Sequence, residues 1–535
     1  MRSGGSTSCS LICRKLDYGD ETSMGFGGCR WVSGNRTTLA RNEESLLDPG
    51  RNCWRIEQAD RAALVVDAAN YFRLARKAML EARSQILLIG WDLDTRIKLI
   101  GEEQDESGED DIPVHLGPFI AWLAKQRPEL RIYILAWNGE LYSLLGRGTT
   151  LARMMVWRLL NKRISFKLDS TPPLAASHHH KILVVDDSMA FCGGIDMTGS
   201  RWDKRDHLDD EPGRQRPTTH RPYGPWHDAT MAVDGAVARA LGELGRRRWQ
   251  KACRELVEPP KEQSDPWPDE LLADFHDVEI AISRTRGDDG EEDEVREIEA
   301  LFVDLIGEAK RFLYVEQQYF ASRVIAEAIC KRLAETDPPE FVIVNPCTAD
   351  GWLEEQVMGA ARAELYETLR KADHKDRFRI YYPVTEQGDE IYVHAKIMIV
   401  DDVVLKVGSA NMNNRSMGLD SECDVTIDAR RPANEGCRLQ IAALRADLMA
   451  EHLGVDPADV GRLFAETGSL IATIDRLRGD GRSLCLYNPP NFGAGAKAVA
   501  KSEVADPESA GEPFEPFARR RLFRGFLQRV RTRHR

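Results

Sequence analysis

Apolar and polar residues alternate along this chain in two series of segments that follow the same order. In the first half, apolar runs of strand length and helical patterns alternate over 85–93, 116–126, 131–137, 151–160 and 163–168. The second half repeats that order over 311–320, 324–335, 341–346, 352–372 and 377–384. Strands that alternate with helices predict an α/β fold whose mixed, largely parallel sheet is covered on both faces.

The length of this repeat indicates a duplicated domain, because the repeats of solenoid proteins are much shorter. We therefore expect two tandem, pseudo-symmetric α/β/α domains over 46–258 and 259–455. A disordered extension is expected over 1–45, a helical cap over 456–486, and a linker with a basic amphipathic tail over 487–535.

Composition narrows the classes of protein to consider. Hydrophobic residues make up 42% of the 535 positions and charged residues 30%, which is typical of a soluble protein with substantial cores. No segment approaches the roughly 20 apolar residues of a membrane span, and no signal peptide is recognised. The eleven cysteines form no C-x-x-C pair, which favours reduced thiols. We expect a cytoplasmic or peripheral-membrane protein, with secretion by a non-classical route as the alternative.

The distribution of charge argues against a nucleic-acid partner and allows contact with an anionic membrane. A net charge of −13 leaves little basic surface for a phosphate backbone, so nucleic-acid binding is not expected. The segment 517–535 is an exception, because its arginines flank Phe523, Phe526, Leu527 and Val530 at helical spacing. Such a helix can lie on an anionic membrane or pack on its own domain, and the sequence leaves both alternatives open.

Two segments share one pattern of residue types and intervals: His-x-Lys, four residues, Asp, six residues, and a pair of small residues. The first copy consists of His179, Lys181, Asp186, Gly193 and Gly194. The second copy consists of His394, Lys396, Asp401, Gly408 and Ser409. One copy would mean little, because His and Lys at strand spacing occur on ordinary surfaces. Two copies at equivalent places in two similar units indicate a shared function.

The three consecutive histidines of the first copy do not predict a metal site. Side chains two apart in a strand share a face, so His179 and Lys181 point one way and His178 and His180 the other. The second copy has Val393 and Ala395 at the latter positions, and no converging ligands are evident. We expect no metal and no cofactor.

The paired motifs fit phosphoryl chemistry. Imidazole can act as nucleophile or proton donor near neutral pH, so two facing histidines could attack phosphorus and protonate the leaving oxygen. Lys181 and Lys396 would neutralise the phosphate oxygens without a divalent metal. Ser409 and Asn411 would add polar donors to the same oxygens.

A nucleophilic histidine also needs a carboxylate that fixes its tautomer and orientation. Asp186 and Asp401 belong to the catalytic motif but have the wrong strand parity for this task, and we expect them at the turn, where they hold the loop. The better orienting candidates follow the glycine turns: Asp203 in "GSRWD" and Glu422 in "LDSE".

The duplicated pattern resembles the phospholipase D superfamily, whose signature is H-x-K-x4-D twice in one chain. The resemblance covers residues 50–455, and "YVEQQYF" (314–320), "GGIDMTGSRWD" (193–203) and "PWHD" (225–228) agree with it. It implies two domains that share one active site, with His179 as nucleophile and His394 as general acid and base. The first copy departs from the second at Gly194, where Ser409 stands in the other, which predicts unequal phosphate contacts.

The resemblance implies an enzyme that hydrolyses the distal phosphodiester of glycerophospholipids, such as phosphatidylcholine, through a covalent phosphohistidine, with transphosphatidylation as a further outcome. The expected partner is a phospholipid at a membrane surface. The alternatives are another phosphodiesterase or phosphatidyltransferase of the same superfamily, either nuclease or cardiolipin synthase-like, and a non-catalytic lipid-binding protein. The segment between Trp202 and His227 is an expected active-site loop, with a plain solvated connector as the alternative.

Overall fold

The computed structural model describes residues 44–101, 112–137, 162–171, 176–349, 358–490, 492 and 506–507. The predicted N-terminal extension, the predicted helix at 151–160 and the basic segment 517–535 lie outside these ranges. Residues from 44 onward form one compact unit. Among the described helices, none has the length and apolar character needed to cross a bilayer.

The strands of the two halves follow the same order in one continuous sheet. From the centre outward, the first half contributes β1 (Arg55–Val66), β8 (Ala229–Asp234), β6 (Met189–Gly193), β5 (Ile182–Val185), β2 (Gln85–Gly90), β3 (Arg131–Trp137) and β4 (Ile164–Asp169). The second half contributes β9 (Phe275–Arg286), β17 (Glu422–Asp428), β16 (Val404–Gly408), β15 (Lys396–Val400), β11 (Phe312–Gln317), β12 (Glu340–Val344) and β13 (Phe378–Val384). The α/β class and its pseudo-symmetry are confirmed.

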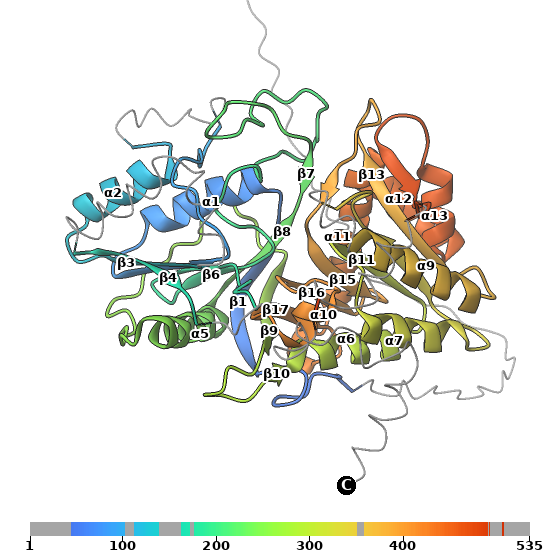
Figure 1. Ribbon diagram of the computed structural model, residues 1–535, viewed down its shortest axis with the longest axis horizontal. Coiled ribbons are helices and arrows are strands. Elements are labelled where there is room, and N and C mark those ends of the chain that lie inside the picture. The colour runs from blue at the N-terminus through green and yellow to red at the C-terminus, as the bar shows by residue number, and fades with distance from the viewer. Residues whose placement is uncertain are drawn as a thin grey trace, which may run out of the picture. The chain divides into compact units, whose positions relative to one another are not determined.

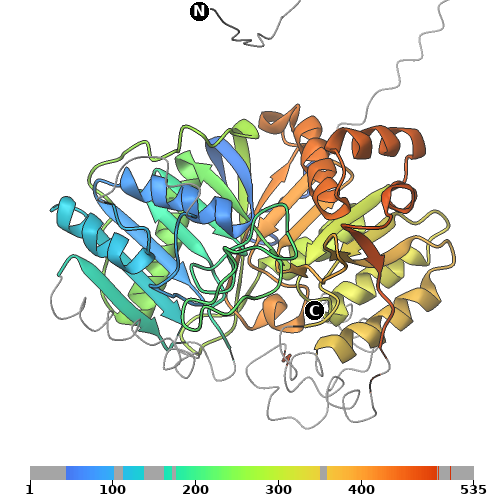
Figure 2. The ribbon, with the colours of Figure 1, turned by 90° about the horizontal axis from the view of Figure 1, so that it is seen from above.

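Antiparallel pairing of β1 with β9 joins the two halves at the centre of the sheet. Figures 1 and 2 show the first-half elements, in blue and green, on one side of this junction and the second-half elements, in yellow and orange, on the other. Two short strands complete the sheet: β10 (Val295–Arg296) pairs with β9, and β18 (Ser483–Leu486) extends the edge beyond β13. The expected cap therefore contains an edge strand besides its helices.

The expectation of a largely parallel sheet is wrong. Only β2–β3–β4 and β11–β12–β13 run parallel, and the other described pairs of this sheet are antiparallel. The reason is that each His-x-Lys segment leads into a hairpin, β5–β6 or β15–β16, and tight turns join antiparallel strands. The sequence pattern also did not predict the long central strands β1 and β9.

Helices cover both faces of the sheet. In the first half, α1 (Ala68–Leu80) and α2 (Leu116–Gln126) lie on one face and α5 (Gly235–Cys253) on the other (Figure 1). The second half and its C-terminal extension contain α6 (Glu297–Glu308), α7 (Arg323–Leu333), α9 (Ala360–Ala372), α10 (Asn414–Gly418), α11 (Cys437–Leu453), α12 (Pro457–Thr467) and α13 (Leu470–Leu477).

Successive residues of β5 enter two different hydrophobic cores. Ile182 and Val184 pack in the core that includes α5, whereas Leu183 and Val185 pack in the core beneath α1 and α2. Because successive side chains of a strand point to opposite faces, a strand buried on both faces has an uninterrupted apolar sequence. This explains why the His-x-Lys motif leads directly into four apolar residues.

The aspartates of the two motifs form tight turns and hold the start of a neighbouring strand. Asp186 and Asp401 adopt φ angles of 51° and 54°, and the residue after each is also left-handed. The carboxylate of Asp186 accepts hydrogen bonds from the backbone N–H groups of Arg83, Ser84 and Gln85 at 2.6–2.8 Å. The carboxylate of Asp401 accepts the same three bonds from residues 310–312 at 2.7–2.8 Å. Each aspartate therefore fixes the entry into β2 or β11.

We predict that Asp186→Asn lowers the free energy of unfolding by roughly 3 kcal/mol, because the new amide group faces N–H donors that need an acceptor. Asparagine tolerates a positive φ, so the turn itself is preserved. Urea unfolding measures the change, and Asp187→Asn is the matched control, since Asp187 shares the turn but bonds to Arg246 instead. Equal losses in the two variants would contradict the prediction.

Candidate active site

The two His-x-Lys segments meet because each pairs with the opposite half of the chain. The backbone N–H of His179 donates to the carbonyl of Ser421 at 3.0 Å, and that of His394 donates to the carbonyl of His227 at 2.8 Å. A small parallel sheet of β7 (Trp226–His227) and β14 (Tyr392–Val393) supports the second contact. Both histidines consequently line one cavity of about 340 Å³.

Each histidine is oriented by a carboxylate from the other half. The Nδ1 atom of His179 lies 3.0 Å from Oε2 of Glu422, and Nδ1 of His394 lies 2.6 Å from Oδ2 of Asp228. Asp228 directly precedes β8 and Glu422 begins β17, and these strands occupy equivalent places in the two halves. The arrangement leaves Nε2 as the reactive nitrogen of each ring.

Glu422 therefore lies where the sequence predicts an orienting carboxylate, but Asp203 does not. The carboxylate of Asp203 accepts hydrogen bonds from the backbone N–H of Trp226 at 2.8 Å and from the side chains of His207 and Arg214. The second orienting residue is Asp228, the last residue of "PWHD". Strand equivalence between the halves is the signal that would have found it.

The lysines are bound in different ways. Lys181 lies 3.1 Å from the Asp196 carboxylate and donates to the carbonyl of His179 at 3.0 Å. Lys396 donates to the side-chain oxygen of Gln318 at 3.2 Å and to the carbonyl of His394. Burial lowers the pKa of Lys396 to about 7 despite the nearby Asp228. The two copies are thus chemically unequal.

Polar and aromatic groups surround the histidines in the cavity. Its other lining residues are Trp91, Trp137, Ser177, Asp196, Arg201, Trp226, Gln318, Tyr319, Met358, Asn411, Asn413, Arg415, Ser416, Asp420 and Glu422. Of the segment between Trp202 and His227, only Trp226 reaches this wall, so the other side chains of that segment do not support a headgroup contact.

Besides Asp203, five predicted site residues do not line the cavity: Lys181, Lys396, Ser409, Asp186 and Asp401. Ser409 does not line the cavity, because its hydroxyl donates to Oε2 of Glu422 at 2.5 Å and so supports the carboxylate. Asn411 does line it, as predicted. Asp186 and Asp401 are absent from the wall and act on the sheet instead, so we revise their assignment from catalytic to structural.

The side chains of His178 and His180, which flank His179, contact other protein groups and do not line the cavity. Nδ1 of His178 lies 2.5 Å from the hydroxyl of Ser421, and Nε2 of His180 lies 3.1 Å from the carbonyl of Glu422. Both contacts tie the first motif to the second half, as expected for side chains on the opposite face of the strand.

The sequence is similar to proteins described as phospholipase D. A sequence model of the family described as Phospholipase D matches residues 361–465. Phospholipase D alpha 4 of Arabidopsis thaliana is 23% identical over 72% of this chain and 64% of its own length. Phospholipase D A of Dictyostelium discoideum is 25% identical over 68% of this chain and 33% of its own length. These similarities support the phospholipase D superfamily, which the duplicated motif predicts.

The chain spans only part of these superfamily relatives, so their full activities do not transfer directly. Among solved structures, a phosphatidylserine synthase of Haemophilus influenzae aligns with a TM-score of 0.49 at 13% identity, over 78% of this chain and 95% of its own. A phospholipase D family member, Nuc of Salmonella typhimurium, aligns with a TM-score of 0.21 over 28% of this chain.

Burial largely determines the protonation states of the histidines and of Glu422 at this site. It lowers the pKa of His179 and of His394 well below the usual value, and Lys181 and Lys396 lower them further. Burial also raises the pKa of Glu422 to about 7, although Lys181 and the hydroxyl of Ser409 oppose the shift. The cavity is therefore lined by two neutral imidazoles, and a neutral ring can act as a nucleophile at Nε2.

We predict that Gly194→Ala destabilises the protein by about 1–3 kcal/mol, because buried groups must move to admit the new methyl group. A Cβ at Gly194 would lie 2.1 Å from Oδ1 of Asp228, the carboxylate that holds His394. Gly224→Ala is the control, since nothing lies within 4 Å of its Cβ position. Urea unfolding of both variants measures the effect, and equal stability would show that Asp228 has room to move.

Proposed function

We propose that the protein is a phosphodiesterase of the phospholipase D type that cleaves the distal phosphodiester of a glycerophospholipid such as phosphatidylcholine. The observation that carries this proposal is the pair of histidines on one cavity, each held at Nδ1 by a carboxylate of the opposite half. The products would be phosphatidate and the free headgroup alcohol.

The first step forms a covalent intermediate. Nε2 of His179 attacks phosphorus, the bond to the headgroup oxygen breaks, and His394 gives that oxygen a proton. In the second step His394 takes a proton from water, whose oxygen attacks phosphorus and releases His179. An alcohol in place of water would give transphosphatidylation. The assignment of His179 as nucleophile follows the superfamily pattern, because both rings are held in the same way, by a carboxylate at Nδ1.

Positive charge for the phosphate oxygens is available within the protein. Lys181 pairs with Asp196 and Lys396 with Gln318, two residues of the cavity wall, and Arg201 and Arg415 line the cavity directly. These groups could neutralise the developing charge without a divalent ion. A bound phosphodiester anion would also raise the pKa values of Lys396 and His394, which favours the protonated forms that the mechanism needs.

The aromatic wall favours a cationic headgroup. Trp91 and Trp137 stack with ring centroids 5.9 Å apart, and both line the cavity with Trp226. Indole faces attract quaternary ammonium groups. Choline is therefore the headgroup that we propose. A nuclease is less well supported, because the net charge of −13 opposes the approach of a polyanion.

Membrane attachment through the basic segment 517–535 remains a prediction. That segment lies outside the described residues.

We expect His179→Ala and His394→Ala each to reduce choline release from phosphatidylcholine vesicles by about 1,000-fold or more, because each removes a reacting group. The exposed His276 provides the control variant His276→Ala, with activity like the unsubstituted protein. Full activity in either site variant would rule out the mechanism. A strict requirement for added Mg²⁺ or Ca²⁺ would contradict a reaction at phosphorus without a divalent ion, and DNA cleavage by the same preparation would favour the nuclease.

We predict a bell-shaped dependence of kcat/KM on pH with its maximum near 7. The rate rises as Glu422, with a pKa of about 7, ionises and can stabilise a positive imidazole ring. It falls at higher pH as Lys396, also with a pKa of about 7, loses its charge. Glu422→Gln should lower the rate and remove the rising limb, and Lys396→Arg should remove the falling limb. Unchanged limbs in these variants would assign them to other groups.

A further inference from the structure

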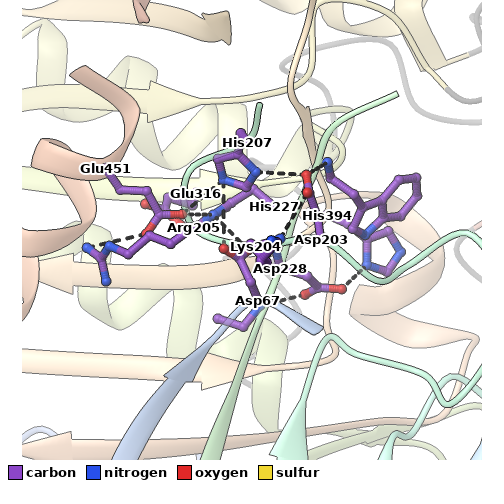
Figure 3. A network of polar contacts seen from close by, with 12 residues as sticks. Asp67, Asp203, Lys204, Arg205, His207, His227, Asp228, Glu316, His394 and Glu451 are labelled. Carbon is purple, nitrogen blue, oxygen red and sulfur yellow. Dashed lines mark hydrogen bonds and ion pairs between the residues drawn. The ribbon is translucent and has the colours of Figure 1, made fainter. Parts of the chain in front are cut away.

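A second cluster of titratable residues lies behind the catalytic cavity. Asp67 follows β1, His207 lies in the segment after Asp203, His227 ends β7, and Glu451 lies in α11. Figure 3 shows their side chains converging from these separate segments. All four are buried, and none of them lines the catalytic cavity.

One atom from each of these four residues faces a common point. Oε1 of Glu451 lies 2.7 Å from Nδ1 of His227 and 3.1 Å from Nε2 of His207. Oδ1 of Asp67 lies 3.5 Å from Nδ1 of His227, and Oδ2 of Asp67 lies 3.8 Å from Nε2 of His207. One ligand atom from each residue can be chosen so that all lie within 4.8 Å of one another. This spacing suits a single bound ion.

The remaining nitrogen of each histidine bonds to a further carboxylate. Nε2 of His227 lies 2.8 Å from Oε2 of Glu316, and Nδ1 of His207 lies 2.9 Å from Oδ2 of Asp203 (Figure 3). Histidines that ligate metals in proteins usually donate their other N–H to a carboxylate or carbonyl, which fixes the tautomer. Both rings here therefore have the outer partner that a metal ligand requires.

Within the described part of the chain, a network of hydrogen bonds alone leaves buried polar atoms of this cluster without a hydrogen-bond partner, among them Oδ2 of Asp67 and Oε2 of Glu451. Burial disfavours charge on His207, but Asp67, Asp203 and Glu451 raise its pKa to about 9, so a protonated ring is one way to balance the carboxylates. Among the described residues, however, Oδ2 of Asp67 is buried without a hydrogen-bond partner. Burying a carboxylate oxygen without a partner is costly, and a cation at the common point would satisfy it.

We propose that Asp67, His207, His227 and Glu451 bind one divalent transition-metal ion of the Zn²⁺ class. Two neutral imidazoles and two carboxylates carry a charge of −2, which the ion would neutralise. Imidazole ligands favour Zn²⁺ and its neighbours over Ca²⁺ and Mg²⁺, which prefer oxygen.

The role of this ion would be structural and positional rather than catalytic. It would tie the segment 203–227 to the end of β1 and to α11. The backbone carbonyl of His227 also accepts a hydrogen bond from the backbone N–H of His394. His227 directly precedes Asp228, whose carboxylate orients the His394 ring. Loss of the ion would therefore loosen the general acid without removing any reacting group.

The test measures metal in the full-length, tag-free protein purified without chelator. We expect about one equivalent of Zn²⁺ per chain by plasma mass spectrometry, and a higher melting temperature when ZnSO₄ alone, but not CaCl₂, is added to the metal-depleted protein. Less than about a tenth of an equivalent, both as purified and after incubation with ZnSO₄ and removal of the excess, would overturn the proposal.

Variants locate the ion. Asp67→Asn and His207→Asn should lose the bound Zn²⁺, Asp203→Asn should bind it about 10–100-fold more weakly, and the control His276→Ala should keep it. Bound Zn²⁺ that survives in both Asp67→Asn and His207→Asn would place the metal elsewhere. Metal content is measured without substrate, so this result is independent of whether the protein cleaves phospholipids.

Discussion

The exchange of carboxylates between the two halves is the constraint on which the site depends. Glu422 of the second half holds His179 of the first, and Asp228 of the first half holds His394 of the second. Neither half alone would contain an oriented histidine. The antiparallel pairing of β1 with β9 makes this exchange geometrically available, because it places equivalent strands on either side of one central junction.

Pseudo-symmetry brings the reacting groups together, and departures from it make them different. Asp228 occupies the space that a side chain at Gly194 would need, whereas the equivalent Ser409 bonds to Glu422. Lys181 lies beside the carboxylate of Asp196, whereas Lys396 donates to the amide oxygen of Gln318 and to the carbonyl of His394. A two-step reaction needs one group to attack and another to transfer protons, and unequal surroundings allow two identical side chains to divide these tasks.

Buried charge is extensive behind the reacting groups, and almost all of it is paired. The turn aspartates each accept three backbone N–H groups, and the cluster around Glu451 links β1, β7, β11 and α11. Isolated buried charges are costly, so such networks persist only when their partners are held in place. Positioning of the active site thus relies on polar contacts that lie one layer away from the cavity.

The sequence alone determined the features that depend on local pattern. Apolar periodicity identified most of the outer strands and the helices of both halves, because burial on one or two faces determines the spacing of apolar residues along the sequence. Repetition identified the motif, strand parity placed Asp186 and Asp401 at turns, and the offset from the second glycine turn located Glu422.

Tertiary structure alone decided which distant groups meet. His179 and Glu422 are separated by 243 positions, and no local pattern encodes the direction in which a strand pairs. For that reason the largely parallel sheet and Asp203 as an orienting group were wrong, Ser409 bonds to Glu422 in place of the predicted phosphate contact, and Asp228 was missed. The physical reason is that periodicity records how deeply a side chain is buried, whereas its partner is set by pairing between strands far apart in the chain.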